Sequence, residues 1–387
     1  MLLRLIILLL LIPVSSWAAP SITGTSGTLT NGQTITISGT SFGTKTTAMP
    51  TISSYDHSTT ANNWSGGSIS GGWGQVASGV DPVTLTTGTP RATYYQSAHK
   101  GTFNSAGEYS AVYGTMNTPE DKIYVSWWNY RNYSSFSSGN NTKWFRVYQS
   151  VAPGESTGNI CFSHCEDNNQ VNNGDEFLTT EFAPSGTWNL SSYVSGVSKG
   201  ATGWFGVDLS PTVGPHLQTW EHWEVFFDYP TTTAGNDGQV IVWKNGRRLF
   251  NATGVTFADG ASDNTGRLIA IGQVSGGLTG TEWFDQIYMD KTIAHVFVSN
   301  SGTVAWPEQT TEHHSEIQVP SAWSASSITF TLNQGTCTNF TSDCKYLYVV
   351  DSTGAISNAY DLSSGGGGGG STPSTVSGCA ISGGKVQ

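Results

Sequence analysis

The chain has 387 residues and a formal net charge of −11, and only 11% of its residues are charged while 12% are aromatic. This length suits one large β domain together with one small domain. The negative charge argues against nucleic acid as a partner, because nucleic-acid binding requires a basic surface. Few charges and many aromatic rings instead suit neutral, hydroxyl-rich ligands such as sugars.

The first segment in chain order, residues 1–19, is predicted to be a secretory signal peptide. Arg4 supplies the positive charge, residues 5–11 form an apolar run, and Ser16-Trp17-Ala18 fits a small-x-small cleavage site. The apolar run is far shorter than the ~20 residues that span a membrane. We therefore expect a secreted protein, extracellular or on the cell surface, with no membrane span in the mature chain.

The segment after the signal peptide and a segment near the other end of the chain look like two halves of one module. Residues 20–45 read "PSITGTSGTLTNGQTITISGTSFGTK", while "SSITFTLNQGTC" and "KYLYVVDSTGAISNAY" follow at 326–337 and 345–360. Together they resemble the IPT/TIG immunoglobulin-like family. We expect a split module, 20–48 with 306–362, around an inserted domain. Two separate partial sandwiches are the alternative, but each would leave sheet edges uncovered.

The intervening residues, 49–305, show short alternating runs bounded by Gly, Asn, Asp or Pro, which predict an all-β sandwich. "VWKNGRRLF" is a predicted hairpin that turns at Asn245-Gly246. The clearest strands are "KIYVSWWNY" (122–130), "KWFRVYQ" (143–149), "HWEVFFDY" (222–229), "QVIVWKNGRRLF" (239–250), "RLIAIGQV" (267–274) and "EWFDQIYMD" (282–290). These Trp-rich strands resemble the concanavalin A-like lectin/glucanase jelly roll, including its laminin-G-like and polysaccharide-lyase members. The expected fold is all-β: this jelly roll plus a small immunoglobulin-like sandwich.

The resemblance implies a glycan on the concave sheet, and strand alternation indicates which side chains face away from the core. That face mixes aromatic rings with Arg, His and Glu, a composition suited to stacking on sugars and to directed hydrogen bonds. The predicted ligand-binding residues are Trp128, Tyr130, Trp144, Arg146, Tyr148, His222 and Glu224. The alternative is that these aromatic residues pack under loops or against the small module.

Three functions follow as expectations. The first is a carbohydrate-binding, lectin-like or adhesion protein whose partner is a polysaccharide or cell-surface glycan. The second is a polysaccharide lyase acting on a uronate polymer, with Tyr148, His222, Arg146 and Tyr130 as catalytic candidates. The third is a structural surface or fibre subunit. A retaining glycosidase is disfavoured, because the nearest carboxylate pair, Glu176 and Glu181, would face opposite sides of a strand.

The cysteines predict two short disulfide loops, Cys161–Cys165 and Cys337–Cys344, and leave Cys379 over. For "CFSHCED" a metal site is the competing interpretation, and secretion favours the disulfide. Calcium is the one cofactor that the sequence suggests, with Asn236, Asp237 and Asp285 as candidate ligands or, alternatively, as turn formers. Residues 363–387 are a Gly-rich flexible tail with no core-forming segment.

Overall fold

The computed structural model describes the backbone of about three fifths of the chain. The described backbone comprises residues 18–50, 52–54, 73–74, 84–87, 97–104, 112–135, 141–148, 159–164, 176–178, 180–182, 188–190, 192–193, 204–205, 219–232, 237–255, 266–275 and 279–364. Side chains are described chiefly in 18–50, 120–130, 219–232, 237–249 and 280–364. Most of the predicted signal peptide and most of the predicted tail lie outside the described residues.

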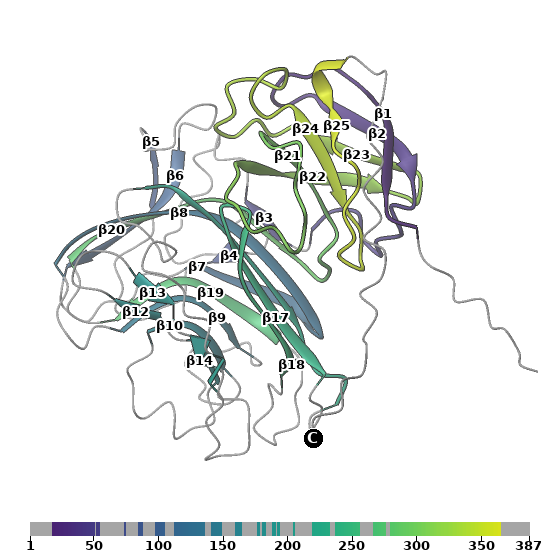
Figure 1. Cartoon of the computed structure of the whole chain (residues 1–387). Coiled ribbons are helices and arrows are strands. Elements are labelled where there is room, and N and C mark those ends of the chain that lie inside the picture. Colours follow the sequence, from purple (N-terminus) through teal and green to yellow (C-terminus); the bar gives the residue numbers. More distant parts are fainter. Residues whose placement is uncertain are drawn as a thin grey trace, which may run out of the picture.

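The protein is all-β, as the alternating sequence runs predict. Three large sheets lie in successive layers, and the only helix among the described residues is a 3-10 turn, η2 (Leu362–Ser364) (Figure 1). No helix in the described part of the chain is long and apolar enough to cross a membrane.

The middle layer is an eight-stranded sheet with the order β18-β17-β16-β8-β20-β6-β5 and β3 paired to β20. Its long central strands are the Trp-rich segments found in the sequence, and they pair antiparallel with their neighbours. The bounds are β3 (Ile52–Ser54), β5 (Thr84–Thr87), β6 (Ser97–Asn104), β8 (Lys122–Ser135), β16 (Glu221–Asp228), β17 (Gly238–Lys244), β18 (Arg247–Val255) and β20 (Thr279–Asp290).

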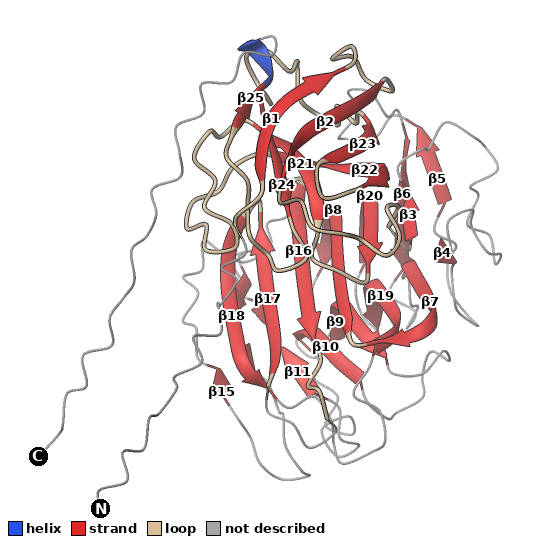
Figure 2. Ribbon diagram, turned by 90° about the vertical axis from the view of Figure 1, so that its right-hand side faces the viewer, coloured by secondary structure: helices blue, strands red, loops and turns tan. Residues whose placement is uncertain are grey.

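A six-stranded sheet with the order β11-β10-β9-β19-β7-β4 lies against one face of the middle layer (Figure 2). The two sheets form the sandwich expected for a jelly roll. The bounds are β4 (Trp73–Gly74), β7 (Val112–Glu120), β9 (Asn141–Tyr148), β10 (Asn159–His164), β11 (Glu176–Leu178) and β19 (Gly266–Ser275), and two small pairs join β12 (Thr180–Phe182) to β13 (Trp188–Leu190) and β14 (Ser192–Tyr193) to β15 (Trp204–Phe205).

The third layer is a seven-stranded sheet that contains both ends of the described chain, and this sheet with its loops is called the small module. Its order is β1-β2-β23-β22-β21-β24-β25, so β2 pairs antiparallel with β23. One apolar core holds Ile22, Ile35 and Ile37 from the first strands together with Phe330 and Val349 from the last. The bounds are β1 (Ser21–Ser26), β2 (Thr34–Thr40), β21 (His295–Ser299), β22 (Ser315–Trp323), β23 (Ser327–Thr331), β24 (Tyr346–Val350) and β25 (Tyr360–Asp361).

The boundary between the layers differs from the predicted one. The chain enters the seven-stranded sheet already at β21, before residue 306, where the sequence suggested that the small module resumes. The chain leaves the seven-stranded sheet after β2 and returns to it at β21, and these two crossings are close in space, because Ile52 of β3 pairs with Met289 of β20. Lys45 and Asp290 form a buried ion pair at this crossing, with 2.5 Å between Nζ and Oδ2.

The middle sheet is buried on both faces. Val225 and Phe227 of β16 belong to one face, and Phe226, on the other face, lies in a second apolar cluster with Phe297 and Tyr348 of the seven-stranded sheet. Alternation along β16 thus separates two buried faces instead of a buried face and a solvent face, because the seven-stranded sheet covers the outer side.

Two local predictions are confirmed. Asn245 and Gly246 have φ values of 49° and 72°, as a two-residue hairpin turn requires. Cys337 and Cys344 form a disulfide with Cα atoms 5.7 Å apart. Cys161 lies on β10, but Cys165 lies outside the described residues, so the bridge between them stays a prediction.

Candidate functional site

Three of the predicted ligand-binding residues lie in a buried layer between the middle sheet and the seven-stranded sheet of the small module. Trp128, His222 and Glu224 are 6%, 1% and 2% exposed. Trp128 stacks on His222 with ring centroids 5.0 Å apart, and it also contacts His314 of the small module at 5.5 Å. A polymer in solvent therefore has no access to these three side chains. The sequence correctly indicated which face they occupy, but not that the seven-stranded sheet covers it.

The buried layer contains a chain of polar contacts around His222. Its Nε2 lies 2.7 Å from Ser126 Oγ, and its Nδ1 lies 3.3 Å from Ser315 Oγ and 3.7 Å from Glu224 Oε2. Tyr124 donates a hydrogen bond of 2.5 Å to Glu224 Oε1. Burial raises the pKa of Glu224 to about 7, and the Tyr124 hydrogen bond opposes this effect. Hydroxyl, imidazole and carboxylate occur in the order of a nucleophilic triad, but they are sealed between two sheets, which suits a structural network.

The other predicted residues are distributed over two different sheets. Tyr130 lies on β8 of the middle sheet and is partly exposed. Trp144, Arg146 and Tyr148 lie on β9 of the six-stranded sheet, where β9 pairs with β10 and β19. Their side chains lie outside the described residues. The structure thus does not gather the seven predicted residues on one sheet.

The edge of the small module forms a step across the middle sheet. The step is the line along which this edge crosses the middle sheet. Three contacts mark it, at the β17–β18 turn, on β8 and on β20. Asn245 at the β17–β18 turn donates to Glu312 at 3.2 Å, Trp128 on β8 contacts His314, and Gln286 on β20 donates to Asn333 at 3.2 Å. Side chains behind the step are buried, and coverage ends just beyond it.

A row of three aromatic side chains lies next to this step, one residue pair further along the strands. Trp283 on β20 pairs directly with Tyr130 on β8. Trp220 precedes β16 and continues its register with β8, with its ring centroid 5.6 Å from that of Tyr130. All three are partly exposed, whereas Trp128 in the next row is buried. Directly paired residues face the same side of a sheet, so the row spans three strands at a spacing of ~4.8 Å per strand.

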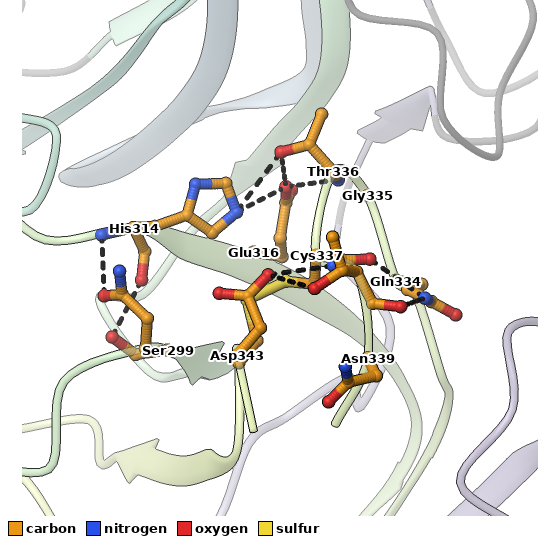
Figure 3. The surroundings of a disulfide bond; sticks show 12 residues. Ser299, His314, Glu316, Gln334, Gly335, Thr336, Cys337, Asn339 and Asp343 are labelled. Carbon is orange, nitrogen blue, oxygen red and sulfur yellow. Dashed lines mark hydrogen bonds and ion pairs between the residues drawn. A yellow bond between two sulfur atoms is a disulfide. The ribbon is translucent and has the colours of Figure 1, made fainter. Parts of the chain in front are cut away.

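The step presents an oriented histidine beside this aromatic row. His314 Nε2 lies 3.0 Å from Glu316 Oε1, and the Glu316 side chain is fully buried. The same carboxylate oxygen accepts hydrogen bonds from Thr336 N at 2.9 Å and from Thr336 Oγ1 at 3.1 Å. The Cys337–Cys344 disulfide follows directly in the chain and closes this loop (Figure 3). The His314 ring is therefore held in one orientation, with 25% of its side chain exposed.

The two predicted calcium ligands that the structure describes, Asp237 and Asp285, do not come together. Asp237 accepts hydrogen bonds from Thr231 N and Oγ1, which stabilise a turn and hold the pKa of this exposed carboxyl below its usual range. Asp285 is buried on β20 and accepts from Gln286 N, and Asn236 lies outside the described residues. Among described residues the one cluster with metal-ligand spacing is His314, Cys337 and Cys344, whose cysteines are already joined as a disulfide.

No protein-family model matches the sequence, and no curated protein is significantly similar to it. Solved structures resemble parts of the fold. Alginate lyase Aly36B is 12% identical, with a TM-score of 0.42 over 63% of this chain and 98% of that one. An endo-β-1,4-glucuronan lyase from the fungus Trichoderma reesei is 13% identical, with a TM-score of 0.34 over 55% of this chain and 92% of that one. The cellulose-induced protein Cip1 is 18% identical, with a TM-score of 0.33 over 54% and 85% of the two chains. These are distant likenesses of fold, and the function proposed below rests on the site itself.

Sequence reasoning missed Trp220, Trp283 and His314 as members of one site. Alternation does place Trp220 on the same side of its strand as His222, which was an available signal. Trp283 joins the row only through the pairing of β20 with β8, whose partners are far apart in sequence. His314 joins it only through the packing of the small module against the middle sheet.

Proposed function

We propose that this chain is a carbohydrate-binding protein and that a polysaccharide binds along the row of Trp220, Tyr130 and Trp283. The observation that carries the proposal is the row itself: three partly exposed aromatic side chains across adjacent strands, beside a polar step. Aromatic faces stack on the apolar faces of sugar rings, and a row at strand spacing suits successive sugars of an extended chain.

Affinity electrophoresis tests this proposal on the purified mature chain, with hydroxyethyl cellulose as a neutral glucan and sodium alginate as a uronate polymer, each with and without calcium. Replacing Trp283, Tyr130 or Trp220 by Ala is expected to weaken binding roughly 2- to 10-fold each, the scale of one aromatic contact. Tyr346→Ala is the matched control, because Tyr346 is a partly exposed aromatic residue on β24. If the polymers retard the three row variants as strongly as they retard the parent, the proposal is contradicted.

The lyase alternative is tested in the same samples by the ultraviolet absorbance of unsaturated uronate. Among its four candidates, His222 is buried under the small module and Tyr130 is partly exposed in the aromatic row. Arg146 and Tyr148 belong to a different sheet. Rising absorbance with alginate would replace the binding function by lyase activity, and Tyr130→Phe would then be the first variant to assay.

We infer further that residues 20–48 and the segment from β21 (His295–Ser299) to residue 362 belong to one secreted IPT/TIG-like module, with a concanavalin A-like domain inserted. The β2–β23 pairing and the core shared by Ile35, Ile37 and Phe330 support this division. Hydrogen exchange tests it: amides of β2 and β23 should show equal protection and one common denaturant dependence. Independent exchange of the two strands would refute a single module.

A further inference from the structure

We propose that His314 is a ligand-binding residue of the small module, and that its Nδ1 accepts a hydrogen bond from a hydroxyl of the sugar bound on the aromatic row. This inference rests on the proposed glycan binding. It adds a polar contact from the other module, so that the complete site lies between the two.

The location of His314 supports this role. Exposure changes at the step, from Trp128 at 6% in one row to the partly exposed Tyr130 in the next. His314 lies at this change, with its ring centroid 5.5 Å from that of Trp128. Residues two apart on one strand face lie ~7 Å apart. A sugar stacked over the row is therefore adjacent to the imidazole.

The hydrogen bonds of Glu316 determine which ring nitrogen of His314 carries the proton. Oε1 of Glu316 already accepts from the backbone N–H of Thr336. When Glu316 is ionised its oxygens only accept, so His314 Nε2, which lies 3.0 Å from Glu316 Oε1 and 3.3 Å from Thr336 Oγ1, is the donor. In the neutral imidazole, the other nitrogen then has a free lone pair. Nδ1 is therefore an acceptor, suited to a hydroxyl and unsuited to a carboxylate oxygen, which cannot donate.

The acceptor is free and rigidly held. The structure gives His314 Nδ1 no hydrogen-bond partner within the described residues, and Figure 3 shows this nitrogen on the side of the ring away from Glu316. The backbone of His314 is fixed as well: its N–H donates to Asn300 Oδ1 at 3.1 Å and its carbonyl accepts from Ser299 Oγ at 2.8 Å. A preorganised acceptor loses little conformational entropy on binding.

Two substitutions separate a ligand contact from a structural role. In His314→Gln the side-chain amide nitrogen takes the position of Nε2 and still donates to Glu316, while the Nδ1 acceptor is lost. In His314→Asn an acceptor oxygen takes the place of Nδ1, while the donor to Glu316 is lost. If His314 binds the sugar hydroxyl, His314→Gln weakens binding roughly 2- to 10-fold, and His314→Asn retains more affinity. If His314 only anchors the loop, the order is reversed.

The experiment is affinity electrophoresis of both variants and Trp283→Ala on hydroxyethyl cellulose and sodium alginate. The thermal midpoint of each protein is measured alongside, and the imidazole nitrogen shifts of the parent are measured by NMR. The inference is supported if His314→Gln binds more weakly at an unchanged thermal midpoint and the NMR spectrum of the parent shows an unprotonated Nδ1 on His314. Unchanged binding by His314→Gln, while Trp283→Ala loses affinity, overturns the inference and leaves glycan binding intact. No retardation of the parent on either polymer overturns both.

Discussion

Glu224 provides a direct test of the buried layer between the middle sheet and the small module. It is 2% exposed, and burial raises its pKa to about 7 from an ordinary value of 4.5. At pH values between these two, the native state therefore keeps a proton on Glu224 that the unfolded chain releases. The difference between the two pKa values corresponds to roughly 3 kcal/mol of unfolding free energy, at 1.36 kcal/mol per pKa unit.

The sign follows from proton binding. Between pH ~4.5 and ~7 the native state binds more protons than the unfolded state, so the contribution of Glu224 to stability falls as pH rises and is level above ~7. His295 and His313 act in the opposite direction. Burial lowers their pKa values to about 3 and about 4, so their contributions rise with pH up to the ordinary histidine value of ~6.5. Only the difference in stability between a Glu224 variant and the parent isolates the contribution of the Glu224 carboxyl.

Glu224→Gln retains an acceptor for the Tyr124 hydroxyl and removes the titration. We expect equal stability at about pH 4 and a gain for the variant of up to roughly 3 kcal/mol at about pH 8. Urea unfolding at a series of pH values measures both, with Asp121→Asn at an exposed carboxylate as control. A Glu224→Gln protein less stable than the parent at about pH 8 would refute the reasoning. It would mean that Glu224 is ionised and paired with His222, whose Nδ1 is 3.7 Å away.

Two further predictions concern the links that hold the modules in place. Lys45→Met leaves Asp290 as an unpaired charge in a buried site, because Lys45 and Asp290 side chains are 1% and 5% exposed, and should cost ~3–5 kcal/mol in urea unfolding. Adding Asp290→Leu should restore most of the loss, and a single-variant loss below ~1 kcal/mol would contradict a buried pair. Replacing Cys337 and Cys344 by Ser opens a loop with a sequence separation of 7, for which chain entropy gives ~2.5 kcal/mol of destabilisation. A double variant as stable as the oxidised parent would contradict that estimate.

Some features depend on neighbouring residues and could be predicted directly. The turn at Asn245-Gly246 needs φ values that these two residues adopt readily, and the structure has them. The Cys337–Cys344 bridge closes a short loop whose ends are already close in sequence. Alternation placed Val225 and Phe227 on one face of their strand, because the side-chain period of a strand is two whatever surrounds it.

The candidate site depended on information that alternation does not contain. The pattern of β16 separates two faces, but it does not say what lies on each of them. Trp128, His222 and Glu224 were expected to face a glycan and instead face the small module. Tyr130 lies two residues beyond Trp128 on β8, outside the edge of the small module.

The sequence by itself determined an all-β chain with Trp-rich strands, a short hairpin turn and one closed cysteine loop, because each is set by local backbone preference or side-chain periodicity. Only the tertiary structure decided which aromatic residues reach solvent. That outcome depends on the pairing of β20 with β8 and on where the small module ends near His314. Both are contacts between segments far apart in the chain, and they are determined by how the whole apolar surface is buried rather than by any local pattern.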